Sequence, residues 1–222
     1  MNTEQNRGIV RLLEITAALR APDGCPWDRE QNHQSIRYHA IEEVYELLDA
    51  IEANDDQEMC EELGDLLLQV VFHCQLARER GSFQFDEVAQ TIADKLIRRH
   101  PHVFGGSNVD SVEAVWTQWE AIKKTEKEGT QHERSSVFDG IPKHLPALLR
   151  AEKLAKKARK QGFIAAEAKA ATVSQEDLAI QLFELSTIAQ AQGWSAEALL
   201  RDESRRRETQ WRELEKAHSQ AG

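Results

Sequence analysis

The sequence predicts an all-α protein, and three observations support this prediction. Glycine and proline are sparse, at 11 and 5 of 222 residues. The abundant residue types, namely Ala, Leu, Glu, Lys, Arg and Gln, favour helices over strands. Apolar residues also recur at helical spacing in several segments. With 41% hydrophobic residues, a chain of this length can bury one large or two small cores.

Net charge and cysteine content exclude several classes of protein. The formal net charge of -10 argues against broad attachment to nucleic acid or to an anionic membrane. Cys25, Cys60 and Cys74 are isolated, so neither a disulfide framework nor a zinc site is indicated. The polar start lacks a leader pattern, and no apolar run approaches the length of a membrane span. We therefore expect a soluble cytoplasmic protein with no nucleic-acid or membrane partner.

Helices are expected in the first half of the chain wherever apolar residues recur at helical spacing between breaks. The expected ranges are Gly8 to Arg20, Ile36 to Ala53, Glu58 to Arg80, Asp86 to Arg99 with Asp86 as N-cap, and Val112 to Lys127. Stops are expected at Ala21-Pro22-Asp23-Gly24, Gly81 and Pro101. The segment from Cys25 to His33 reads as a loop.

Two acidic motifs lie on consecutive expected helices. The first is Glu42-Glu43-x-x-Glu46 and the second is Glu62-x-x-Asp65. A period of 3.6 residues places Glu43 beside Glu46 on one face, and Glu62 beside Asp65 on another. A polar break between the helices would return the second antiparallel to the first. The four carboxylates could then converge.

Such a cluster is unfavourable by itself, because like charges at close range disfavour each other's ionised state. A divalent cation removes the conflict, and oxygen ligands without Cys or His point to Mg²⁺ or Mn²⁺. The alternative is a solvated glutamate-rich face. The apolar residues around Glu62 and Asp65 argue against it, since they predict a helix buried on most sides, where unpaired carboxylates are costly.

Aromatic and amide side chains gather on the expected loop. Trp27 and His33 are suited to stacking on a nucleobase and hydrogen-bonding it, although Trp27 could equally fill a core.

Two pairs of side chains, one of two cations and one of an indole and an ammonium, are candidates for contacting the substrate. Lys95 and Arg99 share a helical face, and could either grip phosphates or simply complement the helix C-terminus. Trp119 and Lys123 also share a face, and could hold a nucleobase and a phosphate or belong to a dimer interface.

The second half of the chain is expected to contain three more helices. After the turn Asp139-Gly140-Ile141-Pro142, Leu145 to Leu154 lie on the first, whose basic residues Lys153, Lys156, Lys157, Arg159 and Lys160 read as a solvated face. The others span about Gln175 to Gln192 and Ala196 to His218.

Taken together, these motifs resemble the MazG family of nucleoside triphosphate pyrophosphohydrolases. Besides the two acidic motifs, the resemblance includes Gly24-Cys25-Pro26-Trp27-Asp28, the run from Ile92 to Phe104, and Trp119-Glu120-Ala121-Ile122-Lys123. It implies a MazG-like helical bundle that forms a homodimer, in which the partner chain completes each active site. It also implies Mg²⁺ on Glu43, Glu46, Glu62 and Asp65, with the triphosphate near Lys95 and Arg99 and the nucleotide near Trp119 and Lys123.

The implied reaction is hydrolysis of a nucleoside triphosphate between the α- and β-phosphates. One of the four acids could accept the proton of the attacking water, and Glu46 is the favoured candidate. A non-catalytic nucleotide-binding scaffold is the alternative. A di-iron bundle ranks last, because the Glu-x-x-His candidates lie near a loop and at the tail.

Full-length relatives of this kind look like two repeats, and the second one here departs from the pattern. Asp177 keeps the first carboxylate of the second acidic motif, but Ile180 replaces the other, and the preceding acidic helix is missing. At the expected polar and basic set, Ser204, Arg206 and Gln210 retain only one charge. We expect a MazG-like repeat over residues 1–127, a linker over 128–136 and a shortened, catalytically inactive repeat over 137–222.

Overall fold

The computed structural model describes residues 7–131, 133–164 and 173–221, and confirms the all-α prediction. These residues form ten helices and contain no strand. The chain divides into two compact units, Met1–Val115 and Trp116–Gly222. The domain boundaries expected from the sequence stay a prediction. No helix in the described ranges is both long and apolar enough to cross a bilayer.

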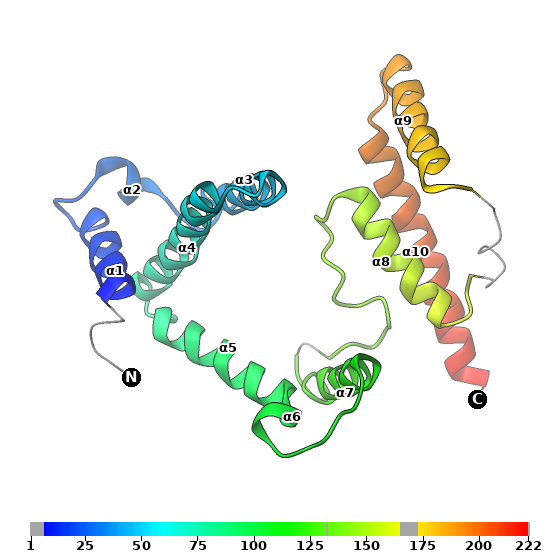
Figure 1. Ribbon diagram of the computed structural model, residues 1–222, viewed down its shortest axis with the longest axis horizontal. Helices are drawn as coiled ribbons and strands as arrows, with labels where there is room; N and C mark the ends of the chain where they lie inside the picture. Colours follow the sequence, from blue (N-terminus) through cyan, green and yellow to red (C-terminus); the bar gives the residue numbers. More distant parts are fainter. Residues whose placement is uncertain (1–6, 132, 165–172, 222) are drawn as a thin grey trace. The chain divides into compact units, whose positions relative to one another are not determined.

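The first unit contains six helices and the start of a seventh (Figure 1). They are α1 (Arg7–Leu19), α2 (Pro26–Glu30), α3 (His39–Ala53), α4 (Asp56–Glu79), α5 (Phe85–Arg99), α6 (Pro101–Phe104) and α7 (Val112–Thr125).

The hairpin of α3 and α4 is the part of the first unit that positions the acidic motifs. Asn54 ends α3 in the left-handed conformation, with φ 54°. Asp55 then caps α4, because its side chain accepts hydrogen bonds from the backbone N–H groups of Gln57 and Glu58. The predicted polar break is therefore a tight connection, and α3 and α4 pack side by side.

The core of the first unit lies at the C-terminal half of α4, where α1 packs and where Ile36, Phe72 and Leu76 form a buried cluster. The prediction that this helix is buried on most sides is wrong for its first half. Leu63 is 50% exposed and Leu67 is 39% exposed. The apolar face of α3 is also largely exposed, with Ile41, Val44, Leu48 and Ile51 at 40–48% exposure.

Local backbone chemistry shifts two other predictions. The expected loop at Trp27 contains α2, because Pro26 can occupy the first turn of a helix without losing a hydrogen bond. The N-cap of α5 is Gln84 and not Asp86, since Gln84 and Glu87 form a reciprocal capping box. Gly24 is required where it stands, because a Cβ there would lie 2.3 Å from the Leu19 carbonyl oxygen.

The second unit also contains α8 (Ala147–Lys160), α9 (Gln175–Ala191) and α10 (Ala196–Ala221). Its core cluster consists of Phe138, Leu154, Ala158 and Trp211. Lys157 does not belong to a solvated face as predicted. It is half-buried and donates hydrogen bonds to the carbonyls of Val137 and Asp139, so it fastens that turn to α8.

Candidate active site

Three carboxylates converge across the α3–α4 hairpin. Glu43 from α3 and Glu62 and Asp65 from α4 each offer an oxygen, and these oxygens lie within 4.8 Å of one another. They meet because Glu62 and Asp65 are three residues apart on one face of α4, and α3 packs against that face. The convergence expected from the sequence is thus present for three of the four acids.

The electrostatics of the cluster are unfavourable without a cation. Burial raises the pKa of Glu62, and the neighbouring charges of Glu46 and Glu58 raise it further. Burial also raises the pKa of Glu43, as do its hydrogen bond with Glu46 and the charge of Asp65. Only the side-chain amide of Gln69, which donates to Glu43 at 3.2 Å, acts in the opposite direction.

Glu62 is the member of the cluster that most needs a ligand. The residue is only 9% exposed, and among the described residues no hydrogen bond or ion pair to it is found. A buried carboxylate normally has a cationic or hydrogen-bonding partner. Two oxygens on opposite sides of Mg²⁺, each at 2.0–2.1 Å, lie about 4.2 Å apart. The cluster therefore fits Mg²⁺ or Mn²⁺ in donor type, and a bound ion would draw its oxygens slightly closer together.

Glu46 lies beside the cluster but not within it. Its proximity raises the pKa values of both Glu43 and Glu62. It also opens onto a pocket of about 330 Å³ at the connection between α3 and α4. That pocket is lined by Glu46, Asp49, Ala50, Ala53, Asp55, Glu58 and Glu62. The acids beyond the two motifs were missed by sequence reasoning, although Asp49 repeats the i, i+3 spacing from Glu46.

Trp27 is 57% exposed on α2, so it does not fill the core. Its indole lies 6.5 Å from the imidazole of His39, at the first residue of α3. His39 was not singled out from the sequence, because its contact with Trp27 depends on how α2 folds back toward α3.

His33 has a different environment from Trp27. Its ring stacks on that of His73 in α4, with centroids 5.1 Å apart, and the two Nδ1 atoms are 2.8 Å apart. One Nδ1 must donate and the other accept, which requires at least one neutral ring. Burial and the charge of His33 both lower the pKa of His73. His33 thus fastens the segment before α3 to α4, and its predicted contact with substrate stays untested.

The cationic candidates lie on other helices. Lys95 and Arg99 are on the C-terminal half of α5, which extends away from the α3–α4 hairpin in Figure 1. The charges that shift the pKa values of Glu43 and Glu62 are carboxylates. Any contact of Lys95 and Arg99 with phosphate therefore stays a prediction.

Trp119 and Lys123 are neighbours in α7, within the second unit. The ammonium of Lys123 lies 5.2 Å from the centroid of the Trp119 ring and donates to Glu120 at 2.9 Å. That hydrogen bond lowers the pKa of Glu120, and the charges of Lys123, Lys160 and Lys157 contribute. Trp116 packs edge-on against Trp119, with centroids 5.3 Å apart. The predicted indole and ammonium pair is therefore present.

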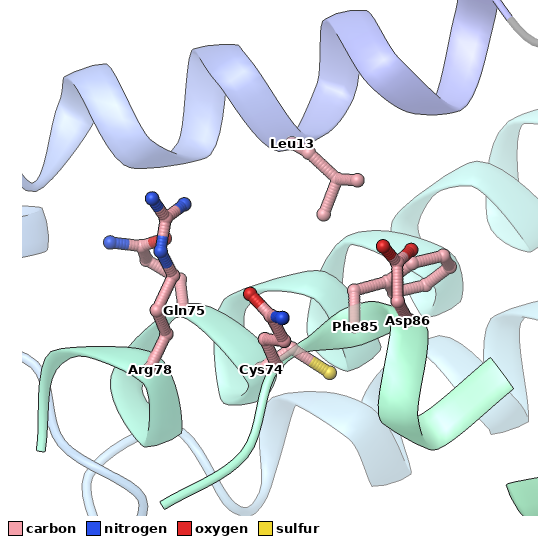
Figure 2. Close-up of a pocket in the computed structure, with 7 residues that line it drawn as sticks. Leu13, Cys74, Gln75, Arg78, Phe85 and Asp86 are labelled. Carbon is pink, nitrogen blue, oxygen red and sulfur yellow. The ribbon is translucent and has the colours of Figure 1, made fainter. Parts of the chain in front are cut away.

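A second pocket lies where α1, α4 and the start of α5 meet (Figure 2). Leu13 projects from α1 toward Cys74, Gln75 and Arg78 of α4, with Phe85 and Asp86 beside them. At about 190 Å³ it is smaller than the roughly 300–1,000 Å³ of typical ligand sites. Burial raises the pKa of the Cys74 thiol, which keeps it protonated and unreactive.

Comparison with known proteins identifies similar sequences. The family model described as MazG nucleotide pyrophosphohydrolase domain matches residues 31–104, which include both acidic motifs. The nucleoside triphosphate pyrophosphohydrolase of Escherichia coli is 39% identical over 94% of this chain and 87% of its own length. Nucleoside triphosphate pyrophosphohydrolase/pyrophosphatase MazG of Thermotoga maritima is 49% identical over 68% of this chain and 57% of its own.

A third relative is the nucleoside triphosphate pyrophosphohydrolase of Mycobacterium tuberculosis, which is 43% identical over 68% of this chain and 46% of its own. Among solved structures, a MazG-related protein from Thermotoga maritima shares 26% identity and a TM-score of 0.45, covering 52% of this chain and 98% of that one.

Proposed function

Because this chain belongs to the MazG family, we propose that it is a nucleoside triphosphate pyrophosphohydrolase that cleaves between the α- and β-phosphates, releasing a nucleoside monophosphate and pyrophosphate. The observation that carries the proposal is the convergence of Glu43, Glu62 and Asp65, of which Glu62 is buried and has no cationic partner in the part of the chain that the structure describes. Such a cluster suits a magnesium triphosphate, since Mg²⁺ keeps positions open for phosphate oxygens.

Each acid has a proposed role. Glu43, Glu62 and Asp65 would hold Mg²⁺, with Mn²⁺ as a substitute. The ion, when bound, supplies charge neutralisation of the triphosphate and acidification of water. Glu46 is the better candidate for the general base, because its oxygens are not part of the convergent set while it is close enough to raise the pKa of Glu43. From there it could accept the proton of a water that attacks the α-phosphorus.

The remaining substrate contacts come from the family resemblance. Lys95 and Arg99 would bind the phosphates, because a guanidinium fork and an ammonium both complement phosphate oxygens. Trp119 and Lys123 would lie near the nucleotide.

We propose a homodimer as the active form. The hairpin leaves Ile41, Val44, Leu48 and Ile51 of α3 at 40–48% exposure, and Leu63, Leu67 and Val70 of α4 are also exposed. Apolar residues gathered on two packed helices are typical of a surface that pairs with another hairpin in a four-helix bundle. The three free cysteines agree with a reducing cytoplasmic location.

The test is a panel of NTPs and dNTPs with and without Mg²⁺, monitored for both pyrophosphate and orthophosphate. We expect pyrophosphate release that requires the metal. Orthophosphate alone would indicate a different phosphohydrolase. Tight nucleotide binding without turnover would instead support the non-catalytic scaffold. The observation that favours this alternative is Ile180, which replaces the second carboxylate of the acidic motif in the second repeat.

A further inference from the structure

Two histidines join α4 to the segment that precedes α3. The rings of His33 and His73 are stacked, with their centroids 5.1 Å apart and their planes 5° from parallel. Their Nδ1 atoms are 2.8 Å apart, which is a hydrogen-bonding distance. Both residues are half-buried. The two rings therefore connect parts of the first unit that are 40 residues apart in the sequence.

The contact is favourable only when both rings are neutral. The Nε2 atom of His33 is shielded from solvent and has no hydrogen-bonding partner among the described residues. A proton there would be costly, so the single proton of His33 belongs on Nδ1, from which it donates to Nδ1 of His73. Protonation of His33 would then add a buried N–H without an acceptor. Protonation of His73 would bring two N–H groups face to face.

The surroundings of the pair do not compensate a positive charge. Burial lowers the pKa of His73, and so does the charge of His33. In the part of the chain that the structure describes, no carboxylate hydrogen-bonds or pairs with either ring. The charged groups of the neighbouring elements have other contacts: Arg20 after α1 pairs with Glu79, Arg37 before α3 donates to Gln34, Glu43 of α3 accepts from Gln69, and Asp86 of α5 lines the smaller pocket.

The segment between His33 and α3 can transmit the position of the pair to the helix. The side chain and carbonyl of Asn32 accept from three of the next four backbone N–H groups, which makes the segment a compact turn. Ile36 adds a buried apolar contact with α4. The connection between α3 and α4 fixes the other end of the hairpin. Glu43 thus lies between two places at which α3 is held against α4.

The same face of α4 carries the histidine and the acids. Glu62, Asp65, Gln69 and His73 occupy positions i, i+3, i+7 and i+11 of this helix. Gln69 donates to Glu43, one turn before His73. The polar contacts that orient α3 on α4 therefore form one row that ends at the histidine pair.

We propose that His33 and His73 are a positioning pair for the active site, which holds α3 against α4 while both rings are neutral and separates when either ring is protonated. Glu43 then loses its fixed place beside Glu62 and Asp65. The catalytic consequence rests on the proposed function, whereas the contact itself does not. Acid acts on the carboxylate cluster in the opposite direction, because protonation relieves the repulsion there.

The test compares the wild type with the double variant His33→Phe/His73→Phe at pH 7.5 and pH 5.0, in saturating Mg²⁺. The phenyl rings can stack but cannot take up a proton. Acidification should lower kcat/KM for nucleoside triphosphates at least about threefold more in the wild type than in the double variant, since the neutral fraction of an imidazole falls tenfold per pH unit below its pKa. His144→Phe, at an exposed histidine of the second unit, is the matched control and should follow the wild type.

Hydrogen exchange provides a readout that does not depend on activity. The backbone N–H groups of Ser35 and Ile36 donate within the turn, and their protection factors in the wild type should fall by about tenfold or more from pH 7.5 to pH 5.0. In the double variant the protection factors should stay constant.

Two results would overturn the positioning pair. One is wild-type protection of this turn that is the same at both pH values, and the other is an equal loss of kcat/KM in acid for the wild type and the folded double variant. If no triphosphate is hydrolysed at all, the proposed function fails separately. Hydrogen exchange of the wild type then decides whether the pair responds to protonation.

Discussion

Glu43 on α3 and Glu62 on α4 present carboxylate oxygens within 4.8 Å of each other, although the two residues are separated by the connection between the helices. The charge of Glu43 contributes to the raised pKa of Glu62, and the pKa of each is above its ordinary value of 4.5. The folded chain therefore places negative charge where it is costly. A bound cation would relieve this repulsion, and that relief would contribute to the free energy of cation binding.

The first prediction concerns pH and metal. A carboxyl group whose pKa is raised by folding binds more protons in the folded state, so stability falls as the pH rises from about 4.5 through the raised pKa values. The melting temperature of the metal-free protein should therefore decrease over that range, and Mg²⁺ should restore it. Glu62→Gln should raise the metal-free melting temperature at pH 7.5 and abolish the response to Mg²⁺.

Differential scanning fluorimetry with EDTA or Mg²⁺ measures both effects. Glu213→Gln, a change on helix α10 of the second unit, is the control and should leave the response to Mg²⁺ intact. A wild-type melting temperature that ignores Mg²⁺ at every pH would contradict a metal site at these acids.

The second prediction separates Glu46 from the acids that converge. If Glu46 is the general base, Glu46→Gln should lower kcat by at least about 100-fold, since proton transfer typically contributes 10²–10⁴-fold. The shift in melting temperature on adding Mg²⁺ should persist. Asp65→Asn should instead lose both kcat and that shift. If the two variants behave alike, Glu46 is a metal ligand and the base lies elsewhere.

The acidic half of the site could be predicted from the sequence because it depends on local rules. Helical periodicity places Glu62 and Asp65 on one face, and the Asn54 and Asp55 break fixes the antiparallel return. The Trp27–His39 contact was not predictable, since it requires α2 to form and Arg20 to hold its C-terminal end through the Gln31 carbonyl. The exposure of Leu63 was missed because an apolar pattern does not tell whether the cover comes from the same chain or from a second one.

The third prediction concerns Arg20 of the α1–α2 connection, which donates hydrogen bonds to the carbonyls of Asp28 and Gln31 and pairs with Glu79 of α4. Arg20→Ala should lower the free energy of unfolding by about 2 kcal/mol, because it leaves carbonyls and a carboxylate without a charged donor. Urea denaturation measures this change. Arg205 is the matched control, since its pair with Asp202 is largely exposed and should contribute less than about 1 kcal/mol. An equal loss in the free energy of unfolding for the two variants would contradict a structural role of Arg20 in holding α2.

The fourth prediction concerns the uncovered hairpin face. Leu48→Glu and Leu67→Glu should each shift the protein from dimer to monomer in light scattering, because a charge would be buried in the apolar contact. Pyrophosphate release should fall with dimer content if the partner chain completes the site. Val10→Glu, at an exposed apolar position on α1, should leave the dimer intact. A wild-type protein that is monomeric at micromolar concentration would contradict the proposed assembly.

The last prediction asks whether residues 137–222, the expected inactive repeat, are only a support. Trp211 is 9% exposed and packs on Phe138, with ring centroids 5.7 Å apart. Trp211→Ala should cost about 3 kcal/mol of stability, in the range measured for large aromatic deletions in cores. The exposed Trp194→Ala should cost far less. If this repeat is catalytically inactive, kcat/KM of the folded Trp211→Ala variant at 15 °C should stay within about twofold of wild type, because 1.4 kcal/mol of lost transition-state stabilisation already corresponds to a tenfold change. A larger loss with the protein still folded and dimeric would show that the repeat contributes to the reaction.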